Sequence, residues 1–193
     1  MQAPTQNLKL FMLLLGAKAP GRHVEQHDYF FGIAANLKDL IPDIKTFWRG
    51  TSANLHIDGW REVTKVDAYT ISVLPESEYA PAATKLFFLN LGGYTTGKLE
   101  EQHYTVLTVQ QNKLQAAQAA KQSVFFKTNT LKGIAASHID EKYGVDVDEV
   151  YQIEDILSEN LKEKYRIVIT DTTTDIPEDE FHLGYIKLDK LVK

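Results

Sequence analysis

Two near-continuous apolar runs mark similar places in the two halves of the chain. The first extends from Lys9 to Gly16 and the second from Lys85 to Gly92, and each ends in glycine. Runs of this length predict central strands whose two faces are both covered. A signal peptide is the alternative for the first run, but its recurrence in mid-chain favours a strand. Neither run approaches the roughly 18 apolar residues that a membrane span requires.

The similarity of the two halves indicates an internal duplication. With an offset of 76 residues, ten of the 19 positions between Lys9 and His27 are identical, where composition alone would give about one. Further along, an offset of 82 residues brings His56-Ile57-Asp58 onto His138-Ile139-Asp140. We therefore predict a first repeat unit at residues 1–83, a second at 84–163, and a C-terminal strand pair at 164–193 that completes the sheet.

Each unit is predicted to contain several strands and one helix. Asn36 and Asn112 are suited to cap a helix start, and Pro42 predicts that the first helix is kinked or starts late. The remaining pattern indicates second strands at 27–34 and 103–109, third strands at 56–58 and 138–140, fourth strands at 69–73 and 151–153, and two C-terminal strands at 164–170 and 182–188 that pair with each other. The fold class is then α+β: two tandem ββαββ-type repeats packed as a pseudo-symmetric two-layer sheet/helix body, with extra C-terminal antiparallel strands.

Composition narrows the classes of partner and compartment. The formal charge is −5 with a pI near 5.7, and cysteine is absent. An acidic chain lacks the basic excess of a nucleic-acid or anionic-membrane surface, so we expect neither partner. The absence of cysteine rules out disulfides and thiolate metal sites. We expect a bacterial, cytoplasmic protein whose partner is an unknown small molecule or protein, with a homodimer left open.

The motifs of the first unit resemble a known family. Leu10 to Asp28 reads LFxLxLGxxxxGxxxExHD, and His56 to Tyr69 reads HIDGWxxVxxVDxY. This pattern resembles the bacterial family catalogued as domain of unknown function 1543 (DUF1543), in two tandem copies over about residues 9–155. The second copy departs from it, with Tyr104 in place of Asp28 and Glu141-Lys142 in place of Gly59-Trp60. The resemblance implies a fold with one or two such units per chain and implies no activity.

Paired carboxylate and imidazole side chains are the strongest candidates for a site. Residues i and i+2 of a strand project to the same face, so each Glu-x-His or His-x-Asp motif presents a carboxylate beside an imidazole. If the strands are neighbours, these groups converge and could bind Zn²⁺, Mn²⁺ or Fe²⁺, or act as a general acid/base pair. The first interpretation is a hydrogen-bonded network that fixes the fold. We assign these residues, with one tryptophan, as candidate binding residues: Glu25, His27, His56, Asp58, Trp60, Glu101, His103, His138 and Asp140. We assign no catalytic residue and no metal ligand, and we expect no cofactor.

Other motifs have structural explanations. Gly92 to Lys98 fits the start of a phosphate-binding loop, but Leu99 follows the lysine and the next element is a predicted strand, which excludes a nucleotide site. Trp48 and Trp60 are candidates for a pocket or an interface, with core packing as the first interpretation. We expect a small ligand-binding or structural/interaction module without catalysis; the alternative is a metal-dependent or acid/base hydrolase that uses the Glu/His/His/Asp residues.

Overall fold

The chain forms an α+β fold, as the sequence predicts. The computed structural model describes residues 7–50, 54–78, 82–94, 98–122, 145–172 and 176–191, and within them ten strands form three antiparallel sheets accompanied by short helices. The chain divides into two compact units, one made of Met1–Ala80 with Leu157–Lys193 and the other of Pro81–Ile156. Among the helices of these described ranges, none has the length and apolarity to cross a membrane.

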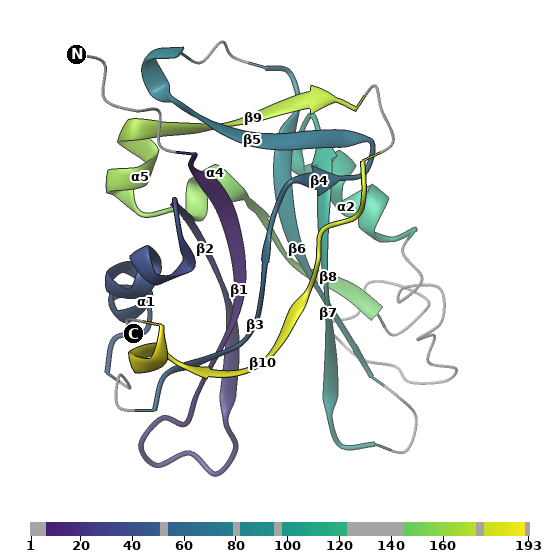
Figure 1. Ribbon diagram of the computed structural model, residues 1–193. Coiled ribbons are helices and arrows are strands. Elements are labelled where there is room, and N and C mark those ends of the chain that lie inside the picture. The colour runs from purple at the N-terminus through teal and green to yellow at the C-terminus, as the bar shows by residue number, and fades with distance from the viewer. Residues whose placement is uncertain are drawn as a thin grey trace, which may run out of the picture. The chain divides into compact units, whose positions relative to one another are not determined.

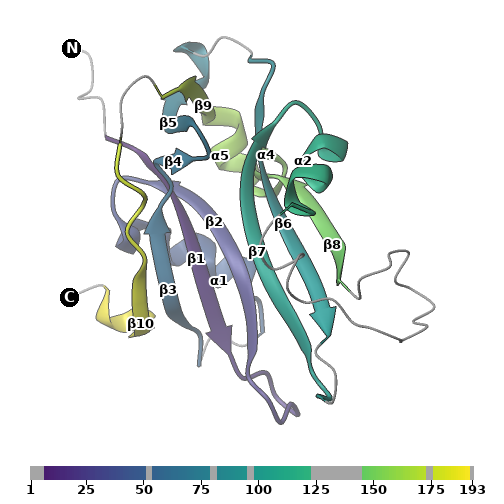
Figure 2. The ribbon, with the colours of Figure 1, turned by 90° about the vertical axis from the view of Figure 1, so that its right-hand side faces the viewer.

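The first unit is built on a four-stranded sheet with the order β10-β3-β1-β2 (Figure 2). Its strands are β1 (Lys9–Ala17), β2 (Gln26–Ala34), β3 (His56–Glu62) and β10 (His182–Lys187). The central strand β1 is the predicted first apolar run, and it pairs with β2 on one side and β3 on the other. Because β1 is covered on both faces, nearly all of its side chains are buried.

A helix covers one face of this sheet. After η1 (Leu37–Leu40), α1 (Ile41–Phe47) lies beside the sheet (Figure 1). Leu40 of η1 and Ile44 of α1 share the hydrophobic core with Leu13, Leu15 and Ile57. The backbone N–H of Asn36 donates to Asp39 Oδ2 at 3.2 Å, so Asn36 begins η1 as predicted. Pro42 occupies the first turn of α1, where its missing N–H costs nothing, and this explains the late start of the helix.

The C-terminal strands do not pair with each other, so that prediction was wrong. The three-stranded sheet β4-β5-β9 contains β4 (Lys65–Val66), β5 (Tyr69–Pro75) and β9 (Tyr165–Asp171), with η2 (Glu76–Glu78) after β5 and α5 (Glu159–Lys164) before β9. The strand β9 pairs with β5 along its full length, and β10, followed by η3 (Leu188–Lys190), pairs with β3. Each C-terminal strand therefore completes an edge that the first 80 residues leave open.

The second unit contains the three-stranded sheet β7-β6-β8. Its elements are β6 (Lys85–Tyr94), β7 (Glu101–Gln110), α2 (Lys113–Ala120), β8 (Val145–Gln152) and α4 (Ile153–Ile156). As predicted, Asn112 caps α2, where its Oδ1 accepts the backbone N–H of Gln115 at 3.0 Å. The apolar side of the sheet packs against Ala116 and Ala120 of α2.

The register corrects the sequence alignment of the third strands. Ile57 lies opposite Leu15, and Val147 lies opposite Leu91, so the corresponding positions differ by 90 residues rather than 82. The strand predicted at Tyr151–Ile153 is instead the end of β8 and the start of α4. His138 and Asp140 lie outside the described residues.

Candidate functional site

Two histidines flank a glycine in the centre of the first sheet. His27 of β2 and His56 of β3 both lie directly opposite Gly16 of β1. Residues that lie opposite each other on neighbouring strands share a face of the sheet, so the two imidazoles stand on either side of a position without a side chain. A Cβ atom at Gly16 would lie 2.5 Å from His56 Nε2 and 2.5 Å from Asp58 Oδ2. The glycine therefore provides the space in which these groups meet.

A β-bulge brings Asp58 into the same space. Leu14 lies opposite Gly59, whereas Leu15 lies opposite Ile57, so Asp58 is the extra residue of β3 at this point. Bulges bend a strand and re-aim a side chain, and they are frequent beside functional sites. Glu25 immediately precedes β2 and completes the cluster from the opposite edge.

Each imidazole faces both carboxylates of this Glu25/His27/His56/Asp58 cluster. His56 Nε2 lies 3.3 Å from Asp58 Oδ1 and 3.5 Å from Glu25 Oε1. His27 Nε2 lies 3.1 Å from Asp58 Oδ2 and 3.7 Å from Glu25 Oε2. One donor atom from each of Glu25, His56 and Asp58 lies within 4.8 Å of the other two, and His27 stands beside this tighter group.

The tautomer of His56 follows from its other ring nitrogen. Nδ1 lies 2.8 Å from the carbonyl oxygen of Asn54, and because a carbonyl only accepts, Nδ1 carries the proton. A neutral His56 then has its lone pair on Nε2, which faces two carboxylate oxygens. Lone pairs and anionic oxygens repel unless a second proton or a cation stands between them. Metal-binding histidines commonly show this arrangement, with the far nitrogen donating to a carbonyl.

One carboxylate oxygen of the cluster lacks a hydrogen bond. Asp58 Oδ2 is buried and has no hydrogen-bond partner among the described residues. His27 Nε2 lies 3.1 Å from this oxygen as an ion-pair contact without forming a hydrogen bond. A buried carboxylate oxygen without a partner is unfavourable, so a simple hydrogen-bonded network leaves this atom unexplained.

The four nitrogen–oxygen distances suit a first-row divalent ion. Nitrogen and oxygen ligands lie about 2.0–2.2 Å from Zn²⁺, so neighbouring ligands of a tetrahedral site lie about 3.4 Å apart. The distances of 3.3 and 3.5 Å from His56 Nε2 to Asp58 Oδ1 and Glu25 Oε1 are close to this value. The distances of 3.1 and 3.7 Å from His27 Nε2 run to the other oxygen of each carboxylate. Imidazole with carboxylate is a donor set typical of Zn²⁺, Mn²⁺ and Fe²⁺.

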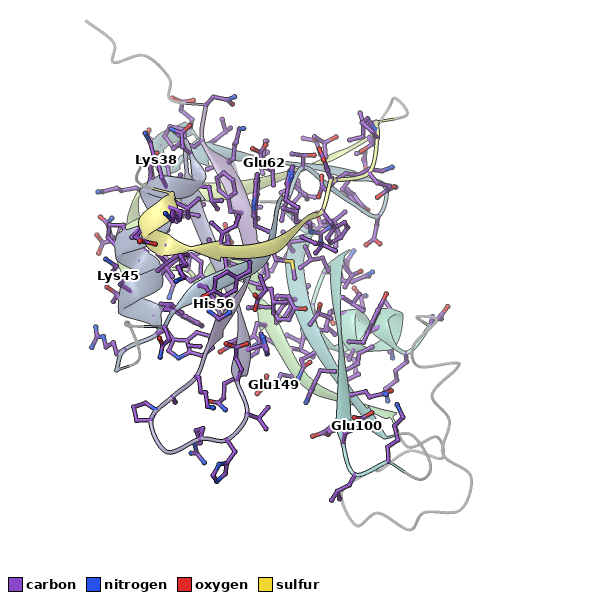
Figure 3. All side chains as sticks on the ribbon, turned by 60° about the horizontal axis from the view of Figure 1, so that its bottom comes forward. Lys38, Lys45, His56, Glu62, Glu100 and Glu149 are labelled. Carbon is purple, nitrogen blue, oxygen red and sulfur yellow. The ribbon has the colours of Figure 1, made fainter. Side chains whose placement is uncertain are left out.

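The cluster is closed on one side and open on the other. The His56 side chain is only 3% exposed and packs against Tyr185 of β10, with the rings tilted by 37° and their centroids 4.3 Å apart. Figure 3 shows His56 beside the β10 ribbon, with which its strand pairs. In contrast, the side chains of Glu25 and His27 are 42% and 45% exposed. Small molecules in solution can therefore reach the β2 side of the cluster.

Trp60 lies apart from the cluster. It is opposite Leu13, packs against Phe11 with the ring centroids 6.1 Å apart, and stacks on His182 of β10 at 4.0 Å. Trp48 also packs against the same hydrophobic core. Both tryptophans are partly buried there.

The second unit contains only part of the pattern. His103 of β7 lies opposite Gly92, and its Nε2 is 3.7 Å from Glu101 Oε2. Its Nδ1 accepts a hydrogen bond from Asn90 Nδ2 at 3.2 Å. On the other side of Gly92 the register places Asp146 where the first unit has His56.

Two residues of this region escaped the sequence analysis. Gly16 was noted only as the end of an apolar run, although its match with Gly92 between two Glu-x-His strands is a signal that could have found it. Tyr185 offered no signal, because its contact with His56 depends on the pairing of β10 with β3.

The fold and the site define an α+β protein of antiparallel sheets with a carboxylate–imidazole cluster in its first unit. Residues 22–73 match the model of the family Domain of Unknown Function (DUF1543), which confirms the resemblance for the first unit and spans all four residues of the cluster. The chain is also similar to the crystal structure of a protein Il1583 from Idiomarina loihiensis, with a TM-score of 0.63, 22% identity, and coverage of 94% of this chain and 97% of that one. At this identity the likeness concerns the fold alone. No curated protein matches the sequence.

Proposed function

We propose that this protein is a ligand-binding module whose ligand is a divalent transition-metal ion. Glu25, His56 and Asp58 bind the ion, and the half-exposed His27 completes its coordination. The observation that carries the proposal is the convergence of donor atoms within 4.8 Å, two from β3 and one from the residue before β2, over a glycine position where a side chain would fill the space. The Asn54 carbonyl supports it by orienting the lone pair of His56 Nε2 toward the same point.

A purely hydrogen-bonded network is the competing explanation of the cluster, and it explains fewer of the observed contacts. A protonated His56 would satisfy the contacts of its Nε2 with the carboxylates, but the buried Asp58 Oδ2, which has the His27 ring as an ion-pair contact, would still lack a hydrogen bond. A cation bound by both oxygens of Asp58 satisfies this atom as well. The two carboxylates also balance the charge of a divalent ion in a partly buried place.

The test is a metal titration of the purified chain after chelator treatment. We expect one tightly bound Co²⁺ or Zn²⁺ ion, detected by elemental analysis and, for Co²⁺, by its visible absorption. His56→Ala and Asp58→Asn should weaken binding by about 100-fold or more, since both remove a ligand from the least exposed side of the cluster. His27→Ala should weaken it less.

His23→Ala is the matched control, because His23 is exposed and lies outside the cluster. Circular dichroism of each variant establishes that it is folded. Folded wild-type protein without bound metal in metal-replete solution would reject the proposal, and so would equal effects of His23→Ala and His56→Ala.

The exposure of the Glu25 side favours a second candidate function. A bound ion with an open position can lower the pKa of its water and present hydroxide to a substrate, as in metal-dependent hydrolases. This is the catalytic alternative for the same cluster. Turnover of an activated ester by the Zn²⁺-loaded chain, lost in Asp58→Asn and retained in His23→Ala, would establish it over simple binding.

A further inference from the structure

We infer that the proposed metal site takes a small organic acid whose hydrocarbon part lies on an exposed apolar row beside the cluster. The inference rests on the proposed function, because the acid's carboxylate would bind the ion. The apolar row is defined by three residues before and within β10: Phe181, Leu183 and Tyr185. Their exposures are 64%, 82% and 60%, although all three are large and apolar or aromatic.

The apolar row lies along the face of the sheet that carries the cluster. His56, Gly59 and Arg61 of β3 lie opposite Gly16, Leu14 and Met12, which alternate along one face of β1. The row covers these three positions of β3 one by one. Tyr185 packs against His56, Leu183 Cδ2 would lie 3.1 Å from a Cβ at Gly59, and the Arg61 guanidinium lies 4.9 Å from the centre of the Phe181 ring.

A hydrocarbon chain that covered Leu183 and Tyr185 would bury apolar surface, which would favour its binding. Contiguous exposed apolar side chains are uncommon on soluble proteins, and they often mark a binding surface. Here the row begins at the ring that contacts a proposed metal ligand. A molecule anchored at the ion can therefore extend along Tyr185 and then Leu183 without leaving this face.

Charge and coordination favour an organic acid as the anchored molecule. The carboxylates of Glu25 and Asp58 balance a divalent ion, so the loaded cluster does not repel one further anionic oxygen strongly. Three or four protein ligands leave a position for an exchangeable donor on ions that accept five or six ligands. The exposed side chains of Glu25 and His27 leave that position accessible.

The experiment titrates the Co²⁺-loaded chain with acetate, butyrate and hexanoate while the visible Co²⁺ absorption is recorded. Full burial of one methylene strengthens binding by about 4-fold, so partial burial on an exposed row should give about 2-fold. Hexanoate, with four more methylenes than acetate, should then bind about 16-fold tighter. Leu183→Ser should remove most of this advantage and leave both the acetate affinity and the Co²⁺ affinity unchanged, since Leu183 lies opposite Gly59 rather than opposite a cluster residue.

Leu114→Ser is the control, because Leu114 of α2 is 69% exposed and belongs to the other unit. Equal affinities for acetate and hexanoate, or an unchanged advantage in Leu183→Ser, would overturn the inference and leave the metal site standing. Failure of Co²⁺ to bind would reject the proposed function itself. A dimer in light scattering that Leu183→Ser converts to a monomer would show that a second copy covers the row, and would also overturn the inference.

Discussion

A single missing side chain sets how closely the groups of the cluster approach one another. Gly16 lies between His27 and His56 in the middle of the sheet, where any other residue would project a Cβ atom into the cluster. The distance of 2.5 Å from that Cβ to His56 Nε2 is shorter than real contacts allow. Neither His56 nor Asp58 can retreat easily, since Nδ1 of His56 is bound to the Asn54 carbonyl and Asp58 is fixed by the bulge.

Gly16→Ala should therefore abolish tight metal binding. The added methyl group displaces His56 and Asp58 from their common centre, and we expect the Co²⁺ affinity to fall by about 100-fold. The free energy of unfolding should fall by about 1–3 kcal/mol, as is usual when extra volume enters a packed site. A Co²⁺ titration and urea unfolding of the same sample measure the two effects.

Gly59→Ala is the control that distinguishes damage to the cluster from damage to the sheet as a whole. Gly59 is next to Asp58, but its Cβ would meet the end of the flexible Leu183 side chain at 3.1 Å rather than the cluster. We expect the Co²⁺ affinity of Gly59→Ala to stay within about 3-fold of the wild type, well below the change expected on loss of a supporting contact. Equal losses in both glycine variants would show that any change in this sheet weakens metal binding.

At the level of elements, the segment that leads into β10 is held by a buried carboxylate. The side chain of Asp179 is 1% exposed and accepts hydrogen bonds from the backbone N–H of Thr64 at 3.0 Å, from Thr64 Oγ1 at 2.6 Å and from the backbone N–H of Lys65 at 3.2 Å. Arg61 Nη1 lies 3.6 Å away. Burial lowers the pKa of the Arg61 guanidinium, and the Asp179 carboxylate opposes that shift by favouring the charged form.

Asp179→Ala should destabilise the protein by about 3 kcal/mol. Removal of Asp179 leaves the more exposed Glu178 as the carboxylate that favours the Arg61 charge in a largely buried place. It also leaves two backbone donors without their acceptor. Urea unfolding measures the loss. Glu178→Gln is the control, because Glu178 pairs with Lys65 at 2.6 Å but is 82% exposed, and such surface pairs contribute about 0–1 kcal/mol. Similar losses in both variants would contradict the role assigned to burial.

The prediction of elements from sequence succeeded where the pattern is local. The first and second strands of both units follow from their apolar runs, and the helix starts follow from Asn36 and Asn112. The pairing of the C-terminal strands was wrong because nearness in sequence favours a hairpin, whereas β3 and β5 each had an open edge for a distant strand. Local patterns contain no information about which edges remain open.

The candidate site shows the same division. The i, i+2 spacing of Glu25 with His27 and of His56 with Asp58 identified four side chains that the structure brings together. The bulge at Asp58 and the row on Tyr185 and Leu183 depend on strand register and tertiary pairing. Alternation along a strand predicts which face a side chain takes, but it cannot predict the distances across three strands.

Across the whole molecule, the two units share a topology. In each, the first strand is central, the second and third pair with it antiparallel, and a helix follows the second strand. Both pairings with the third strand shift register at corresponding places, between Leu14 and Leu15 and between Asn90 and Leu91. This agreement supports the proposed duplication. The alignment of the third strands from sequence was wrong because it followed three identical residues at 138–140, whereas the strand register gives the corresponding positions.

The corrected register predicts that the chain binds one transition-metal ion rather than two. The residues opposite Gly92 are His103 and Asp146, so in the part of the second unit that the structure describes no histidine takes the place of His56. In addition, Asn90 Nδ2 donates to Nδ1 of His103, which leaves the proton of the neutral ring on Nε2, the nitrogen that faces Glu101. In the first unit Leu14 stands at the position that corresponds to Asn90, so it offers no such donor. The Asn54 carbonyl accepts a hydrogen bond from Nδ1 of His56, which leaves the lone pair of that ring on Nε2.

Elemental analysis of the Co²⁺-saturated chain after gel filtration should then give one ion per chain. His56→Ala should reduce this ratio to near zero, whereas His103→Ala should leave it at one, because among the described residues it is the first unit that presents a lone pair on Nε2 beside two carboxylates. Two ions in the wild type, of which His103→Ala removes one, would mean that the second unit has kept the site despite the changed residue opposite Gly92. The number of Co²⁺ ions per chain in these two variants therefore tests the metal site. It also tests the 90-residue offset between corresponding positions of the third strands, which places Asp146 where the first unit has His56.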